Sequence, residues 1–306
     1  MSKALVFTEY GPPEVLHLID TAPPLPGAGK VRVRVKAAGI QPFDCLFRSG
    51  AMRQRMPAKF PQRLGNDFAG IVDAVGEGVT GFTVGSEVLG WAVLESYAEH
   101  VVVGVEQLVG KPAGMPWAEA GALPASGQTA STALAQLGVG EGDTVLIHAA
   151  AGGVGSLAVQ LARARGATVI GTARERNHDY LRGLGAIPVV YGDGLVERVR
   201  AVAPRGVDAA LVAVGSEEAL HASLALVKDR QRLGTIAFHP LADTLGIRRI
   251  SSERSAARLA ELVTLHTEGK LRVPVQRTYT LAEAPEAHRE MEGGHVRGKL
   301  VFVHMF

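Results

Sequence analysis

The sequence predicts an α/β protein that combines a β-rich part with a doubly wound parallel sheet. Three observations support this fold class. The chain has 306 residues, which is more than one ordinary compact domain needs. Strand-like runs dominate before Ser126, whereas strands alternate with helices after it. Beyond Lys270 the sequence returns to β character, so we expect two domains.

Three strand-like runs mark the β-rich part. Residues 31–36 alternate strictly between valine and a basic residue, which is the pattern of a half-buried strand. Residues 69–75 and 99–103 are further runs of residues that favour strands. Gly78, Gly81 and Gly85 separate such runs and indicate turns.

The middle of the chain repeats a strand–helix pattern. We expect buried strands at residues 144–147, 167–170, 207–214 and 233–238, and helices at 154–165 and 180–184. This alternation is typical of crossover units, which build a parallel sheet covered on both faces. Residues 247–250 are expected to form the last, edge strand of that sheet. An amphipathic helix should follow at 253–268, and a final strand at 299–303.

Composition and charge exclude several classes of protein. Hydrophobic residues make up 47% of the chain, which is enough for a sizeable core. The 32 basic and 30 acidic residues form no basic stripe, so we expect no nucleic-acid partner. The single cysteine, Cys45, excludes an intrachain disulfide. No apolar run has the length of a membrane span or a signal peptide, so we expect a cytoplasmic protein without a membrane partner.

A glycine-rich loop links the first predicted strand and helix of the parallel sheet. Residues 148–155 read HAAAGGVG, with Ala150 in place of the first glycine of the dinucleotide fingerprint. Gly152 would let the backbone approach a pyrophosphate, and Gly155 would let the helix pack closely on the strand. Gly153 and Val154 open the helix, whose free N–H groups and dipole favour an anion. This context indicates a dinucleotide-binding loop of the Rossmann type; the alternative is a tight structural turn.

The end of the second strand indicates which cofactor is bound. Sites for NAD place an acidic residue there, whereas this chain has Thr172-Ala173-Arg174. A guanidinium suits the charge and geometry of a 2′-phosphate. The sequence therefore favours NADPH, with Arg174 as the main contact and Asn177 and Arg176 as weaker candidates. Alternatively, Arg174 is a solvated loop charge.

With these motifs in view, the chain resembles the zinc-free branch of the medium-chain dehydrogenase/reductases, the quinone oxidoreductases similar to zeta-crystallin. The resemblance covers nearly the whole chain. Besides the loop, it rests on these segments: AAGIQPFD at 37–44, RSG at 48–50, GNDFAG at 65–70, GALP at 121–124, GQTA at 127–130, Ala287-His288 and Gly298-Lys299.

The resemblance implies a two-domain enzyme. Residues 1–125 and 266–306 would form a GroES-like substrate domain, and residues 126–265 an inserted Rossmann domain that binds NADPH. Hydride would pass to a quinone or a conjugated carbonyl. The resemblance also implies a homodimer that forms through residues 247–250.

The resemblance further assigns roles to individual residues. Thr129 would lie beside the nicotinamide and its ribose. Gln41, Phe43 and Asp44 would line the floor of the cleft, with Gln41, Asp44 and Thr129 as the candidates for positioning the substrate. The loop residues would hold the pyrophosphate. The residues expected around the adenosine ribose and its phosphate are Thr172, Arg174 and Tyr191.

The chain departs from the family pattern at three places. Gln41 replaces a common asparagine, Leu46 replaces a tyrosine of many quinone reductases, and the segment after Phe238 is short. These departures leave the substrate open. The leading hypothesis is a quinone or enone reductase. The alternatives are an enoyl-thioester or secondary-metabolite tailoring reductase and, in another class, a non-catalytic NADPH-binding sensor.

No metal site is expected. Zinc-dependent relatives bind the catalytic zinc through Cys, His and a further side chain, and this chain has Gln41 and Asp44 at the corresponding place. Asn66-Asp67 replaces the His-Glu pair, and one cysteine cannot build a four-cysteine lobe. Asp67 and Asp44 are interpreted as buried, hydrogen-bonded side chains rather than as acids. Cys45 and His148 are interpreted as packing residues. For His239, a loop role and a place near the nicotinamide remain alternatives.

The expected mechanism leaves most of the chemistry to the cofactor. During reduction of an enone or quinone, negative charge builds up on the carbonyl oxygen. Backbone N–H groups, Gln41 or Thr129 are the candidates for stabilising that charge, and the final proton would come from solvent.

Overall fold

The computed structural model describes residues 1–303, which form two compact units. The first, here called the β-rich unit, contains Met1–Ala125, Ser255–Thr267 and the described residues from Val273 on. The second, the parallel-sheet unit, contains Ser126–Arg254 and Glu268–Arg272. The fold class predicted from the sequence, with a parallel α/β sheet and a β-rich partner, is confirmed.

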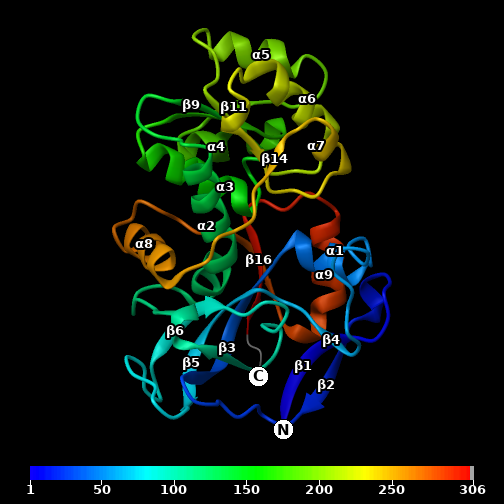
Figure 1. The fold of residues 1–306 in the computed structure, drawn as a ribbon, viewed down its shortest axis with the longest axis vertical. Helices are drawn as coiled ribbons and strands as arrows, with labels where there is room; N and C mark the ends of the chain where they lie inside the picture. The colour runs from blue at the N-terminus through cyan, green and yellow to red at the C-terminus, as the bar shows by residue number, and fades with distance from the viewer. Residues whose placement is uncertain (304–306) are drawn as a thin grey trace. The chain divides into compact units, whose positions relative to one another are not determined.

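The β-rich unit is built on a seven-stranded sheet and a smaller three-stranded sheet (Figure 1). The path of the larger sheet is β15 (Val275–Tyr279), β16 (Lys299–Val303), β3 (Lys30–Ile40), β5 (Asp67–Val75), β6 (Glu87–Trp91) and β8 (Leu108–Gly110), and β7 (His100–Gly104) also pairs with β3. The smaller sheet is β2 (His17–Thr21), β1 (Ser2–Phe7) and β4 (Gln62–Arg63). The strand expected at 299–303 is confirmed in full, and the other predicted strands of this unit are confirmed with shifted ends.

Strand β3 explains why the alternating pattern predicted only half of its length. Val31, Val33 and Val35 are buried while the basic residues between them are partly or fully exposed. From Ala37 onward both faces are covered, so the alternation of polar and apolar residues stops although the strand continues to Ile40. Burial of large side chains such as Phe47, each contributing about 2 kcal/mol, supports the core of this unit.

The helices of the β-rich unit were largely missed from sequence. They are α1 (Pro42–Arg48) and α9 (Ala284–Glu292), together with the first half of α2 (Trp117–Gln136) and α8 (Ala256–Thr267). Short 3-10 turns lie at Pro13–Val15, Val105–Gln107 and Leu281–Glu283. Helix α2 is buried on nearly all sides and contains Pro124, so it has no amphipathic period that sequence reasoning could detect.

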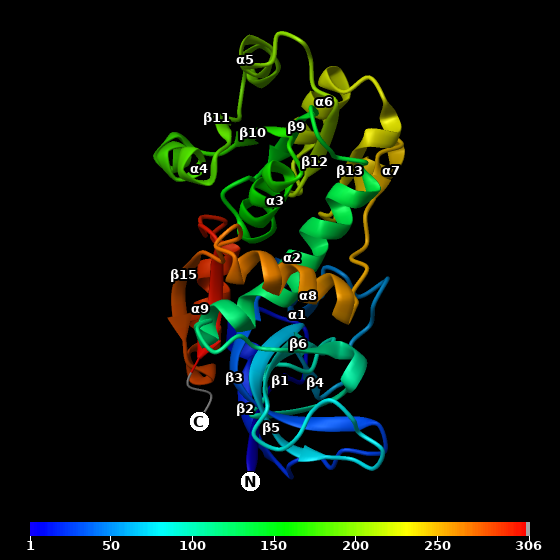
Figure 2. The ribbon, with the colours of Figure 1, turned by 90° about the vertical axis from the view of Figure 1, so that its left-hand side faces the viewer.

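Helix α8 belongs to a different unit from the one expected. We expected residues 126–265 to form the cofactor domain, which would include most of this helix. In the structure α8 belongs to the β-rich unit, and the His266 Nε2 atom lies 2.8 Å from Glu119 Oε2 at the start of α2. Both views show α8 beside α2 (Figures 1 and 2).

The parallel-sheet unit has six strands in the order β11-β10-β9-β12-β13-β14, and every pair is parallel. Counted along the chain, this is the 3-2-1-4-5-6 order of a dinucleotide-binding fold. Its strands are β9 (Thr144–His148), β10 (Thr168–Thr172), β11 (Ile187–Val189), β12 (Ala209–Val212), β13 (Leu233–Thr235) and β14 (Arg248–Arg249). The short strand β14 lies at the edge of the sheet, as predicted.

Helices flank this sheet in both views (Figures 1 and 2). They are α3 (Gly153–Ala164), α4 (His178–Leu184), α5 (Leu195–Val202), α6 (Glu217–Leu226) and α7 (Pro240–Thr244), with 3-10 turns at Glu175–Asn177 and Arg230–Arg232. The predicted helices 154–165 and 180–184 correspond to α3 and α4. Helices α5, α6 and α7 were not predicted.

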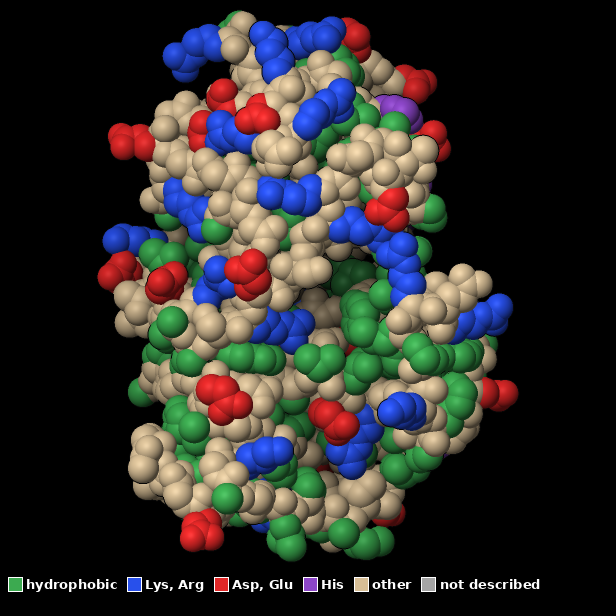
Figure 3. Space-filling model, in the orientation of Figure 1, with side chains coloured by type: hydrophobic (Ala, Val, Ile, Leu, Met, Phe, Trp, Pro, Cys, Tyr) green, Lys and Arg blue, Asp and Glu red, His purple; other side chains and the backbone are tan. Residues whose placement is uncertain are grey.

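The surface agrees with the charge balance of the sequence. On the face shown in Figure 3, acidic and basic side chains are interspersed, and apolar side chains gather over the β-rich unit. Among residues 1–303, no helix is long and apolar enough to cross a membrane.

Candidate functional site

The loop between β9 and α3 is held in one conformation by backbone contacts. Ala149 has a positive φ of 51°, the left-handed region that side chains rarely adopt. The Ala150 N–H donates to the Thr172 carbonyl (3.0 Å), and the Gly152 N–H donates to the Ala149 carbonyl (3.0 Å). The loop is thus tied to the end of the neighbouring strand β10.

Gly155 allows the helix to approach this loop closely. A Cβ atom at this position would lie 2.2 Å from the Ala149 carbonyl oxygen and 2.8 Å from the Ala150 Cα atom. At Gly152 the corresponding distance to the Ala149 oxygen is 3.3 Å. Gly155 therefore has a severe steric requirement, whereas the one at Gly152 is mild, and the role of Gly152 in approaching a pyrophosphate stays a prediction.

The first turn of α3 can receive an anion. Gly152 caps the helix in an extended conformation, and Gly153 and Val154 are partly exposed there. The first N–H groups of a helix have no partner within it, and the helix dipole adds positive charge at that end. No acidic residue lies in this turn. The geometry fits a pyrophosphate at residues 152–155.

Thr172 supports the loop from the end of β10. Its side chain is buried, and its Oγ1 atom accepts a hydrogen bond from the Ala149 N–H (3.2 Å). The same oxygen lies 3.4 Å from His148 Nδ1, and His148 Nε2 lies 3.0 Å from Ser223 Oγ. The Thr172 hydroxyl therefore contacts the loop directly, and its expected place beside the adenosine ribose stays a prediction.

His148 is a packing residue. Burial lowers its pKa to about 4, because the interior disfavours the charged imidazolium. A neutral ring with hydroxyl partners at both nitrogens agrees with the role inferred from the sequence.

Arg174 and Tyr191, predicted separately, lie together. The Arg174 Nε–H donates to the Tyr191 hydroxyl (2.7 Å), and both side chains are exposed. Arg174 follows β10, and Tyr191 follows the neighbouring strand β11. Asn177 is close by, since its N–H donates to the Arg174 carbonyl (2.9 Å) before α4 begins. The Tyr191 hydroxyl therefore orients the Arg174 guanidinium, at the position where the phosphate on the adenosine ribose is expected.

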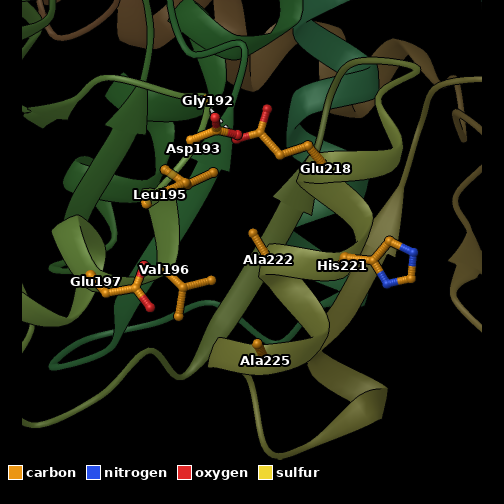
Figure 4. A pocket seen from close by; sticks show the side chains of 10 residues that line it. Gly192, Asp193, Leu195, Val196, Glu197, Glu218, His221, Ala222 and Ala225 are labelled. Carbon is orange, nitrogen blue, oxygen red and sulfur yellow. Dashed lines mark hydrogen bonds between the residues drawn. The ribbon is translucent and has the colours of Figure 1, made fainter.

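A contact that the sequence did not predict anchors the loop carrying Tyr191. The Gly192 N–H donates to Glu218 Oε1 (2.6 Å) at the start of α6. Behind this contact lies a hollow of about 390 Å³ between α5 and α6. Figure 4 shows Ala222 and Ala225 on one side of it and Leu195 and Val196 on the other. Its lining combines these apolar side chains with ionisable ones, among them Asp193, Glu197 and His221. The hydrogen bond between Gly192 and Glu218 fixes the loop that carries Tyr191.

The β-rich unit contains a buried polar cluster centred on Asp44. This carboxylate accepts hydrogen bonds from the Gln41 N–H (3.0 Å), the Gly65 N–H (3.2 Å), Asn66 Nδ2 (3.1 Å) and the Tyr97 hydroxyl (2.6 Å). Burial raises its pKa to about 6, although these donors favour the charged form. Asp44 holds the start of α1 and the loop before β5, as expected for a structural aspartate.

Gln41 is oriented by Asp67. Its Nε2 atom lies 3.1 Å from each carboxylate oxygen of Asp67, and the Ala125 N–H donates to the same carboxylate (3.3 Å). Asp67 is fully buried. A Cβ atom on Gly39 would lie 2.9 Å from both of its oxygens, so a glycine in β3 makes room for the carboxylate.

Lys299 adds a buried amine to this cluster. Its side chain is buried in β16, and Nζ donates to the Ile40 carbonyl (3.2 Å). Burial lowers its pKa, while the charges of Asp67 and Asp44 act in the opposite direction. The Gly298-Lys299 motif marked this residue in the sequence, but nothing there indicated its partners. Tyr97 had no sequence signal.

Cys45 is a buried packing residue, as interpreted from sequence. Its Sγ atom lies 3.5 Å from His288 Nδ1, and burial raises the pKa of the thiol. Burial also lowers the pKa of His288 to about 3, with a contribution from the nearby Arg48 charge. Thiolate chemistry is therefore disfavoured here.

Thr129 and His239 lie in the parallel-sheet unit. Thr129 is partly buried in α2. The ring of His239 accepts a hydrogen bond from the Leu241 N–H (3.3 Å) and caps α7, which favours the loop role.

The residues at the position that holds zinc in zinc-dependent relatives do not fit zinc. Gln41 and Asn66 carry amides, and the carboxylates of Asp44 and Asp67 accept hydrogen bonds from neighbouring groups. Within residues 1–303, no group of three or more His, Cys, Asp or Glu side chains could hold a metal ion.

Comparison with known proteins identifies the family. Residues 27–139 match the alcohol dehydrogenase GroES-like domain, and residues 184–302 match a domain described as zinc-binding dehydrogenase. A quinone oxidoreductase from Pseudomonas aeruginosa is 34% identical, and the alignment covers 99% of this chain and 100% of the relative.

Two solved structures are also similar. The Escherichia coli quinone oxidoreductase complexed with NADPH has a TM-score of 0.87 at 28% identity, covering 98% of this chain and 99% of the other. The CurK enoyl reductase has a TM-score of 0.88 at 26% identity, covering 99% of both chains. The fold, the glycine loop and these similarities agree, and the chain belongs to the quinone oxidoreductase branch of the medium-chain dehydrogenase/reductase family.

Proposed function

We propose that this oxidoreductase transfers a hydride from NADPH to a quinone or an α,β-unsaturated carbonyl, without zinc. The observation that carries the choice of NADPH is the Arg174–Tyr191 pair at the ends of β10 and β11. A guanidinium oriented by a phenol suits a 2′-phosphate, whereas an NAD site would use a carboxylate there. The E. coli relative that was solved with NADPH supports the same choice.

In this proposal the described residues bind and orient, and the cofactor supplies the hydride. Residues 152–155 hold the pyrophosphate by their N–H groups, and Arg174 and Tyr191 hold the 2′-phosphate. Asn177 begins α4 beside them. Thr129 positions the nicotinamide ribose. Gln41 contacts the bound acceptor, and Asp44 keeps α1 and Gln41 in place. The final proton comes from solvent.

The role of Arg174 is tested by comparing cofactors. Arg174→Gln should raise KM for NADPH by about tenfold or more, the loss of one hydrogen bond to a charged group, and leave KM for NADH unchanged. Arg182→Gln is the matched control, since it removes an exposed arginine that pairs with Asp179 in the same unit. Equal effects on both cofactors, or none, would contradict the assignment.

An enoyl-thioester or tailoring reductase is the second candidate function. The CurK enoyl reductase matches over the whole chain. Leu46, which is 38% exposed on α1, offers an apolar surface where quinone reductases of the resembled group carry tyrosine. Turnover of a crotonyl thioester that exceeds turnover of 1,4-benzoquinone would favour this candidate.

The proposal extends to assembly and location. Strand β14 is the edge of its sheet, so two copies could pair through it as a homodimer. Light scattering of the purified protein tests this, and a monomeric mass would contradict it. An NADPH-dependent reductase with one cysteine fits the reducing cytoplasm.

A further inference from the structure

We propose that Asp67 is a positioning residue that fixes the orientation of the Gln41 amide, so that Gln41 offers its carbonyl oxygen as a hydrogen-bond acceptor to the bound cofactor or substrate. This inference rests on the proposed function, since it assumes that Gln41 contacts the bound molecules. Under this proposal Gln41 does not donate to the developing negative charge, so Thr129 and backbone N–H groups are the remaining candidates for that role.

The chemistry of the pair determines the orientation. An ionised carboxylate only accepts hydrogen bonds, so the amide nitrogen of Gln41 must face Asp67. Both carboxylate oxygens lie 3.1 Å from Nε2, and the opposite orientation would bring Gln41 Oε1 against them. The amide oxygen is therefore turned away from Asp67, and it can receive a hydrogen bond only from an N–H or O–H group.

The carboxylate itself is held by its surroundings. The Ala125 N–H binds one of its oxygens, and Gly39 lacks the side chain that would displace it. The charge of Lys299 lies near enough to act on Asp67, since this carboxylate raises the lysine pKa against the effect of burial. A buried charge fixed on several sides costs free energy to maintain, which favours a positional role over simple packing.

The first test exchanges donor and acceptor. In Asp67→Asn an amide faces an amide, so Gln41 can reverse, and kcat should fall about tenfold, the loss of one hydrogen bond. The affinity for NADPH should change little, because the glycine loop is untouched. The double variant Asp67→Asn with Gln41→Glu restores an acceptor–donor pair with the original net charge, and it should recover most of kcat.

The second test uses pH. In Gln41→Glu two carboxyl groups face each other and share one proton at low pH, which preserves an acceptor oxygen. As pH rises this proton is lost and the charges repel, so activity relative to wild type should fall. Other titrating groups near the pair are Asp44, Tyr97 and Lys299. They are present in both proteins, so comparison with wild type at each pH removes the part of their effect that the two proteins share.

Asp73→Asn is the control variant. It lies on the same strand, β5, and its carboxylate pairs with Arg32 at 2.8 Å rather than with Gln41. Its kcat should equal that of wild type. Thermal unfolding of each variant establishes that the protein is folded. Wild-type kcat in Asp67→Asn would overturn the proposal, as would a folded double variant no more active than Asp67→Asn.

A readout without turnover separates this inference from the proposed function. The side-chain ¹⁵N–¹H signals of Gln41, assigned by their loss in Gln41→Met, should shift in Asp67→Asn and stay in place in Asp73→Asn. If no acceptor is reduced but these shifts occur, the proposed function fails while the hydrogen bond between Gln41 and Asp67 stands. If the Gln41 signals are insensitive to Asp67→Asn, the positioning fails whatever the protein reduces.

Discussion

Gly155→Ala provides the sharpest test of the cofactor loop. The added methyl group would lie 2.2 Å from the Ala149 oxygen, far inside the 3.4 Å at which ordinary van der Waals contact begins. The atoms it meets belong to backbone, and the Ala150 hydrogen bond to β10 restrains them. Overpacking of this kind costs about 1–3 kcal/mol. For a unit of this size the melting temperature should fall by roughly 2–4 °C for each kcal/mol.

Two assays check this prediction. Thermal unfolding measures the stability, and titration with NADPH, followed by fluorescence, measures the dissociation constant. The dissociation constant for NADPH should rise about tenfold or more, which corresponds to about 1.4 kcal/mol. The reason is that the added methyl group pushes the loop and the first turn of α3 apart.

Gly183→Ala is the matched control. It lies inside α4, and a Cβ atom there would meet nothing within 4 Å. The substitution should stabilise the protein by about 0.5–1 kcal/mol, because alanine favours a helix more than glycine does. If Gly155→Ala behaves like Gly183→Ala and binds NADPH normally, the reasoning about close approach at the loop is refuted.

Three further predictions concern buried polar groups. Asp44→Asn turns an amide nitrogen toward N–H donors such as Asn66 Nδ2, and two donors cannot bond to each other. The free energy of unfolding, measured by urea denaturation at pH 8, should therefore fall by about 1–3 kcal/mol, and an unchanged midpoint would contradict this. Lys299→Met removes the buried amine near the two carboxylates, and the free energy of unfolding in the same assay should fall by about 3 kcal/mol, whereas a rise would contradict a stabilising role of Lys299. His148 has a pKa of about 4 in the folded protein, below its ordinary value of 6.5, so the unfolded chain takes up a proton first as pH falls. The free energy of unfolding is therefore unaffected by this group above pH 6.5 and should decline by about 3 kcal/mol as pH falls to 4. His148→Gln should reduce the decline measured over this range, and an identical pH profile would exclude this role.

The sequence predicted those parts of the fold that have a local signal. Alternation located β3 as far as Val35, and the glycine loop located β9 and α3, because each pattern reflects burial or steric limits within a few residues. Helix α2 was missed because it is buried on almost every side. Helix α8 was assigned to the other unit, since its amphipathic pattern does not specify which surface it covers.

The same distinction holds for the candidate site. The loop, Arg174 and Tyr191 could be inferred from local motifs and a resemblance, and the structure adds that the last two contact each other. The partners of Gln41 could not be inferred. Asp67 and Lys299 come from strands far apart in the sequence, and only the pairing of β3 with β5 and β16 brings them together. Tyr97 lies in a loop with no pattern at all.

The most direct test of the account is the rate of NADPH oxidation with 1,4-benzoquinone, 9,10-phenanthrenequinone and a set of α,β-unsaturated ketones, each repeated with NADH. We expect turnover with at least one acceptor and a clear preference for NADPH, which Arg174→Gln should remove. A preference for NADH would show that the Arg174–Tyr191 pair does not bind a phosphate. Tight NADPH binding with no turnover of any acceptor would contradict the proposed reductase and favour a cofactor-sensing role.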